Sequence, residues 1–178
     1  MVIFFIHTYD NIQMLVHQET SYLAERRSSP LLSRDERFDA QSGELFNDLL
    51  VMDKEYDVLF RRLFLEAQAE ISLRISSNYF KDLPTDFKPE NNGHPSFKYG
   101  DDFLLLLQMH DDFAMEYKKS IDVKIQQFII DYICWRWFET KSPRDAQFYF
   151  ERWNKTISDI KSLLMRRLRG MRRLPSFP

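Results

Sequence analysis

Cysteine and glycine are scarce in this chain, and both shortages narrow the kinds of protein it can be. One cysteine among 178 residues excludes an internal disulfide framework. Cys134 lies in the apolar run 128–138, where we expect a buried thiol. Four glycines disfavour a fold with many tight turns and a glycine-rich phosphate-binding loop.

Long hydrophobic runs are also missing. Val2–Ile6 is too short for the apolar centre of a signal peptide, and no basic segment precedes it. No run approaches the ~20 residues that cross a bilayer. We therefore predict a cytoplasmic protein without membrane contact.

The motifs of common catalytic classes are absent as well. The sequence contains no G-x-S-x-G, no P-loop and no G-x-G-x-x-G. The histidines stand at none of the spacings that zinc sites use. They are His7, His17, His94 and His110. We expect no catalytic residue and no cofactor.

One acidic segment, 101–116, is a candidate metal site. Asp112 and Glu116 are four residues apart and would share a face of a helix, where their carboxylates could bind Mg²⁺. A second helix with further ligands is not evident. We therefore interpret the segment as a solvated acidic face and expect no bound metal.

What the chain does contain is apolar and aromatic material for a core. It is 44% hydrophobic and 15% aromatic, which predicts one folded domain spanning residues 1–178. Residues 1–118 carry a net charge of −9 and residues 119–178 a net charge of +7. The halves could neutralise each other within one fold, or favour head-to-tail contact between copies and a partner at the basic end.

Helical spacing of apolar residues dominates the pattern. Ser142 and Pro143 are typical of the N-cap and first position of a helix, and they separate two long helical segments. We predict an all-α fold: a bundle of four to five helices with a C-terminal antiparallel helical hairpin. The helical segments are about 9–27, 53–79, 102–117, 119–139 and 143–169. Val2–Ile6 is compatible with either a strand or the start of a helix.

Two connecting segments interrupt these helices. The composition of the segment from about 28 to 43 predicts a mobile connector. Three prolines in the segment from about 81 to 99 predict a long Pro-rich loop. That loop interleaves aromatic with polar residues, so we expect Phe87, Phe97 and Tyr99 to contact another subunit.

A second group of aromatic residues gathers around the turn at Ser142. Core packing explains most of them, but Trp135, Trp137 and Phe148 fall off the main apolar stripes. A single helix pair cannot bury every side of itself, so we also expect these three residues at an oligomer contact.

The basic C-terminal tail, about 166–178, offers a different surface. It is a candidate for non-specific contact with nucleic-acid phosphates, for complementing the end of a helix, or for an acidic protein neighbour. Its arginines are Arg166, Arg167, Arg169, Arg172 and Arg173. A nucleic-acid-associated helical protein is the alternative function that this tail predicts.

Three segments resemble small helical proteins encoded in the head–tail region of prophages of the Bacteroides group. They are Met14–Tyr22, the helix Tyr56–Tyr79 with its Glu66–Glu70 segment, and the final hairpin ending in Leu174–Phe177. The layout is similar to that of head–tail connector (adaptor) proteins of tailed phages. The resemblance implies a ring-forming, non-enzymatic virion protein that associates with itself and with other virion proteins.

Overall fold

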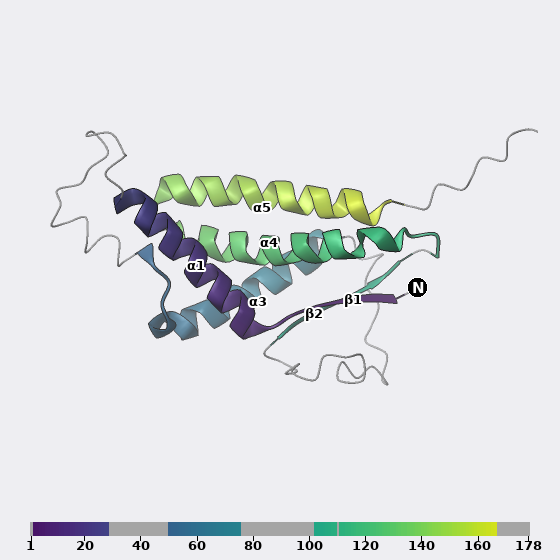
Figure 1. The fold of residues 1–178 in the computed structure, drawn as a ribbon, viewed down its shortest axis with the longest axis horizontal. Coiled ribbons are helices and arrows are strands. Elements are labelled where there is room, and N and C mark those ends of the chain that lie inside the picture. The colour runs from purple at the N-terminus through teal and green to yellow at the C-terminus, as the bar shows by residue number, and fades with distance from the viewer. Residues whose placement is uncertain (1, 29–49, 76–101, 110, 167–178) are drawn as a thin grey trace, which may run out of the picture.

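In the computed structural model the chain is mostly helical, and the structure describes residues 2–28, 50–75, 102–109 and 111–166. Two long helices, α4 (Lys118–Phe138) and α5 (Pro143–Leu164), run in opposite directions side by side (Figure 1). Helices α1 (Tyr9–Ser28) and α3 (Asp57–Arg74) pack on α4 from other sides. Within the described residues, no helix is long and apolar enough to cross a membrane.

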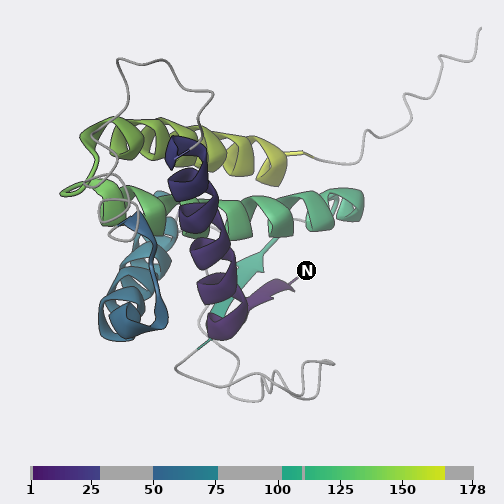
Figure 2. The same cartoon turned by 60° about the vertical axis from the view of Figure 1, so that its left-hand side comes forward.

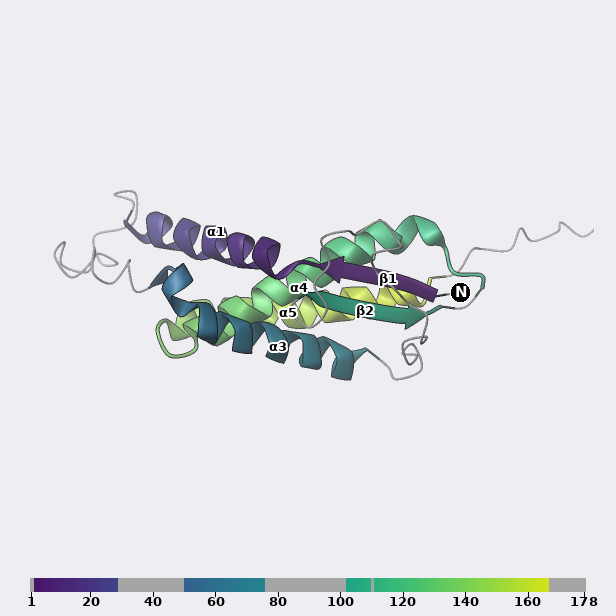
Figure 3. The ribbon, with the colours of Figure 1, turned by 90° about the horizontal axis from the view of Figure 1, so that it is seen from below.

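A small sheet makes the fold more than a helical bundle. Strand β1 (Val2–His7) pairs antiparallel with β2 (Phe103–Gln108), with His7 opposite Phe103 and Val2 opposite Gln108. Figure 3 shows the two strands side by side, at one end of the layer that contains α1 and α3. The expectation of a purely all-α fold is therefore wrong, whereas the prediction of a largely helical protein is confirmed.

The sheet replaces the predicted helix 102–117. Residues Phe103–Gln108 form β2, and a short 3-10 turn η5 (Met115–Tyr117) precedes α4. Short apolar runs fit a buried strand as well as a helix, and here the equally apolar β1 supplies the backbone partner that a strand needs. The open question at Val2–Ile6 is settled in favour of a strand.

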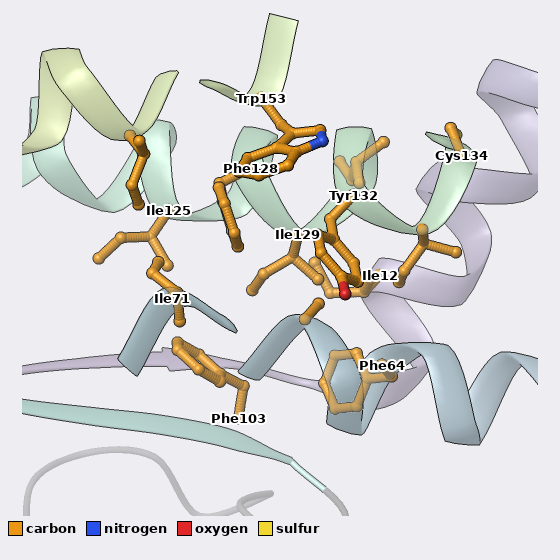
Figure 4. Packing of buried hydrophobic residues seen from close by; sticks show 14 of the residues in the cluster. Ile12, Phe64, Ile71, Phe103, Ile125, Phe128, Ile129, Tyr132, Cys134 and Trp153 are labelled. Atoms are coloured by element: carbon orange, nitrogen blue, oxygen red, sulfur yellow. The ribbon is translucent and has the colours of Figure 1, made fainter. Parts of the chain in front are cut away.

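Helix α4 lies at the centre of the molecule. Figure 2 shows it between α5 on one side and α3 and the sheet on the other, with α1 crossing it. A helix covered on several sides must be apolar nearly all round, which explains the run 128–138. Figure 4 shows Phe128, Ile129 and Tyr132 of α4 meeting side chains from the surrounding elements.

A local signal fixes where α5 begins. Ser142 is the N-cap of α5, Pro143 occupies its first turn, and the Ser142 hydroxyl donates to the Asp145 carboxylate. Asp53 begins the predicted helix 53–79, but in the structure it precedes the 3-10 turn η2 (Lys54–Tyr56) and makes no capping bond through its side chain.

Candidate functional site

The three aromatic residues predicted at an oligomer contact lie in three different environments. Phe148 on α5 is 56% exposed. Trp135 is half-buried, with its ring 5.4 Å from that of Phe150 and 5.6 Å from that of Trp153. Trp137 is 3% exposed and belongs to the core of its own chain.

Trp137 must therefore be removed from the predicted contact set. Its indole Nε1 donates to the Leu50 carbonyl at 2.7 Å, and its ring packs edge-on against Tyr56 at 4.8 Å. The segment that leads into α3 covers this tryptophan. The spacing of apolar residues in α4 and α5 alone gives no information about that contact. Phe148 and Trp135 stay predictions for a contact surface.

A lysine lies over the same tryptophan. The Lys141 ammonium is 3.1 Å from the centre of the Trp137 ring and 5.1 Å from that of Tyr56. Burial lowers the pKa of Lys141 to about 8. The aromatic faces attract this cation at the turn between α4 and α5, which ties the turn to the 50–56 segment.

The predicted charged tail is represented in the described structure by its first residue. Arg166 is exposed, and its guanidinium lies 5.2 Å from the centre of the Tyr117 ring, just before α4 begins. The other four arginines of the tail lie outside the described residues: Arg167, Arg169, Arg172 and Arg173. The loop residues Phe87, Phe97 and Tyr99 also lie outside them. Nucleic-acid contact and loop-mediated contact both stay predictions.

The acidic pair does not form the helical face that its spacing suggested. Asp112 precedes the 3-10 turn that contains Glu116, so the two residues share no α-helix. Over the part of the chain that the structure describes, no group of three or more His, Cys, Asp or Glu side chains could hold a metal ion.

Sequence reasoning missed the most buried charged group in the described structure. Asp131 of α4 is fully buried, and Arg152 of α5 binds both of its oxygens at 3.1 and 3.0 Å. The same guanidinium reaches Glu19 of α1 at 3.0 Å, and the Tyr149 hydroxyl donates to Glu19 at 3.2 Å. Gln127 donates to Asp131 at 2.8 Å. This Asp131–Arg152–Glu19 network joins three helices.

The sequence carries a signal for two members of this network. Glu19 falls on the apolar stripe of its helix, and Asp131 interrupts the apolar run 128–138. A charged residue at a core position needs a partner of opposite charge. The guanidinium of Arg152 is held by two carboxylates, so the arrangement is that of a structural ion network that fixes how α1, α4 and α5 pack.

Burial raises the pKa of Asp131 to about 6, although Arg152 and Gln127 both favour its charged form. The folded protein therefore binds this proton more tightly than the unfolded chain does. We expect the free energy of unfolding contributed by Asp131 to fall by about 2 to 3 kcal/mol as the pH rises from about 4 to above 6. Urea denaturation of the native protein and of Asp131→Asn across this range measures the difference.

The Asp131→Asn variant removes the titrating group but keeps its size. We expect its stability to vary less steeply between these pH values than that of the native protein. Two parallel stability curves would contradict the assignment of this proton to Asp131.

Strand β1 ends in a histidine and borders a shallow hollow. His7 is buried, its Nε2 is 3.4 Å from an Asp122 oxygen, and burial lowers the pKa of the imidazole while Asp122 opposes the change. The hollow has a volume of about 420 Å³ and is lined by apolar strand residues and by both signs of charge, including Glu116 and Lys119. Its mixed charge favours no one class of ligand.

The outer face of α3 is the second feature that sequence reasoning missed. Its inner face belongs to the core, as the apolar spacing predicted, through Phe60, Phe64 and Ile71. Its outer face leaves Val58 85% exposed and Leu73 80% exposed. The sequence does carry a signal for this outer face: a second set of apolar residues in the same segment, at helical spacing and on the side opposite the core.

Comparison with protein-family models, curated proteins and solved structures finds no match to this chain. The likeness to phage connector proteins thus stays a prediction drawn from the three segments described above. The functional argument depends on the surfaces and contacts of the molecule itself.

Proposed function

We propose that this protein is a non-enzymatic structural protein that works by assembling with copies of itself. The observation that carries the proposal is the pair of apolar faces on α3. One face packs against α4 inside the molecule, while the other presents Val58, Leu65 and Leu73 to solvent. Exposed apolar residues that recur along one face of a helix are typical of protein contact surfaces.

The aromatic end of the α4–α5 pair supports the same function. Phe148 and Phe150 are exposed on α5, and Phe150 packs beside the half-buried Trp135. Aromatic residues that are anchored on one side and accessible on the other are enriched in protein interfaces. The helices that display them are joined by the Asp131–Arg152–Glu19 network, which fixes how α4 and α5 pack.

The more specific form of the proposal is a head–tail connector component of a tailed phage, as the resemblance implies. The helical pair would then be an antiparallel hairpin that contributes to contacts within a ring, and other virion proteins would be its partners. In that case the protein acts in the cytoplasm during assembly and in the virion afterwards. Portal, capsid or tail genes beside its own gene would support this form, and their absence would count against it.

Self-association can be tested directly by sedimentation velocity over a wide range of protein concentrations. We expect the average mass to rise from the monomer value of 21.6 kDa toward a multiple of it as the concentration increases. Salt screens charged contacts but does not weaken apolar ones, so the association should persist in 0.5 M NaCl. A species that keeps the monomer mass at the highest concentration would contradict the proposed function.

A further inference from the structure

The outer face of α3 carries an apolar stripe directly opposite its core face. Val58, Leu65 and Leu73 are 85%, 50% and 80% exposed, and Ala69 is also exposed. At 100° per residue these positions point away from the core side of the helix, with Arg62 in the gap between Val58 and Leu65. The five residues form one stripe, called the outer stripe below.

The spacing of the outer stripe is symmetric about its middle. Val58 and Leu73 lie equally far from the point between residues 65 and 66, and Arg62 and Ala69 also lie equally far from it. A two-fold axis through that point, perpendicular to the helix, would bring Val58 opposite Leu73 and Arg62 opposite Ala69 of an identical helix, with the two Leu65 side chains offset by one residue at the centre. The stripe is therefore complementary to itself in an antiparallel arrangement, as an isologous interface requires.

We propose that α3 packs antiparallel against α3 of a second copy of this chain, about a two-fold axis next to Leu65. Val58 of each copy meets Leu73 of the second copy, and the two Leu65 side chains meet at the centre. Arg62 faces the small Ala69 of the second copy, which leaves room for its long side chain. This inference rests on the proposed function and names the surface that performs it.

Charges favour the antiparallel orientation over the parallel one. Arg62 already pairs with Glu66 of its own helix at 3.0 Å. In the antiparallel register it faces the small, uncharged Ala69 of the second copy, so no like charges meet across the contact. A parallel pair would place Arg62 against Arg62 of the second copy, and like charges in contact are destabilising.

The contact is small, which sets the expected affinity. Helix α3 has 18 residues and is therefore about 27 Å long. One pair of such helices lies at the low end of specific interfaces, below about 1,200 Å², where weak and reversible association is typical. We expect a dissociation constant at the weak end of the range for protein interfaces, roughly micromolar.

Cysteine cross-linking tests the register of the two helices. The native protein is a suitable background, because its single cysteine should not react. Cys134 is fully buried and burial raises the pKa of its thiol well above the usual value, so it should form no intermolecular disulfide. We expect Leu65→Cys to cross-link with itself on mild oxidation. Val58→Cys and Leu73→Cys should cross-link efficiently when mixed and poorly when each is alone. Val123→Cys, at an exposed site on α4, is the control for random collision.

Substitution at the centre measures the energetics. Leu65→Glu places two carboxylates at the axis, and we expect it to weaken self-association at least tenfold in sedimentation. Leu65 lies on the solvent side of α3, so the helical circular dichroism and the Tm of the monomer should stay close to those of the native protein. A loss of folding can thus be told apart from a loss of association.

Each alternative result overturns a distinct statement. Efficient cross-linking of Val58→Cys with itself would show a parallel pair and overturn the antiparallel arrangement. An oligomer in which Leu65→Cys does not cross-link and Leu65→Glu has no effect would place the contact elsewhere, and the proposed function would stand without this inference. A strict monomer would overturn both. A monomer whose Leu65→Cys resists a thiol reagent would show that another part of the chain covers the stripe.

Discussion

Replacing Arg152 with alanine is expected to lower the free energy of unfolding by about 3 kcal/mol at pH 7.5, which corresponds to a drop in Tm of roughly 10 °C. The guanidinium binds the fully buried Asp131 carboxylate through two nitrogens and also binds Glu19. Its removal leaves a charge in the core without its counter-ion. Chemical denaturation followed by circular dichroism measures the loss.

A matched control for this experiment lies on the same two helices. Lys124 of α4 and Asp159 of α5 form an ion pair at 2.6 Å, but both side chains are well exposed to solvent. We expect Lys124→Ala to cost about 0.5 kcal/mol, because water replaces the lost partner. Equal losses for Arg152→Ala and Lys124→Ala would contradict the importance of burial at Asp131.

The pH dependence of the same variant sharpens the test. Near pH 5, below the raised pKa of Asp131, most folded molecules carry a neutral carboxyl. The loss caused by Arg152→Ala should therefore shrink as the pH falls from 7.5 to 5. Adding Asp131→Asn to Arg152→Ala should recover part of the stability at pH 7.5, because the two changes act on one pair.

Replacing Trp137 with alanine is expected to destabilise the protein by about 4 kcal/mol. The substitution empties the space beside Tyr56 and removes the hydrogen bond from the indole to the Leu50 carbonyl. It also removes the aromatic face beneath the Lys141 ammonium. Urea denaturation at neutral pH gives the free-energy change directly.

Phe148 is the matched control, since the sequence pattern placed it in the same group as Trp137. It is more than half exposed, so Phe148→Ala should change the free energy of unfolding by less than about 0.5 kcal/mol. Trp137→Phe should lie between the two, at about 2 kcal/mol, because it keeps most of the volume and leaves the Leu50 carbonyl without its donor. A large loss for Phe148→Ala together with a small one for Trp137→Ala would reverse the burial assigned to each.

Those parts of the fold that depend on local signals were predictable. The start of α5 follows from Ser142 and Pro143, and the inner face of α3 follows from apolar residues at helical spacing. The hydrogen bonds and packing that create these features involve residues within one or two turns of each other. Sequence periodicity reports contacts of that range well.

The sheet was not predictable in the same way, because its two strands lie far apart in the sequence. The segment from Phe103 contains four consecutive leucines, a residue with good helix propensity, but β1 offers it a partner that local patterning cannot see. Asp102 illustrates the point. It stands at the start of the predicted helix 102–117, but in the structure it accepts a hydrogen bond from the backbone nitrogen of Tyr9 at the start of α1.

The same distinction between local and long-range contacts applies to the candidate surfaces. Periodicity identifies residues that do not fit one core face, such as Phe148, but it cannot tell whether a distant segment covers them, as the 50–56 segment covers Trp137. The Asp131–Arg152–Glu19 network likewise joins residues from three helices. Such contacts depend on how the helices are arranged, and the sequence of each helix constrains that arrangement weakly.

The pairing of β1 with β2 has a consequence for the order of folding. About a hundred residues separate His7 from Phe103, so the strands can meet only after a long loop has closed, at an entropic cost that local contacts avoid. Helices α4 and α5, joined by four residues, can associate early and provide the surface on which the rest condenses. The N-terminal strand would then be the last element to join the fold. During synthesis the sheet cannot form until the chain has been made as far as Gln108.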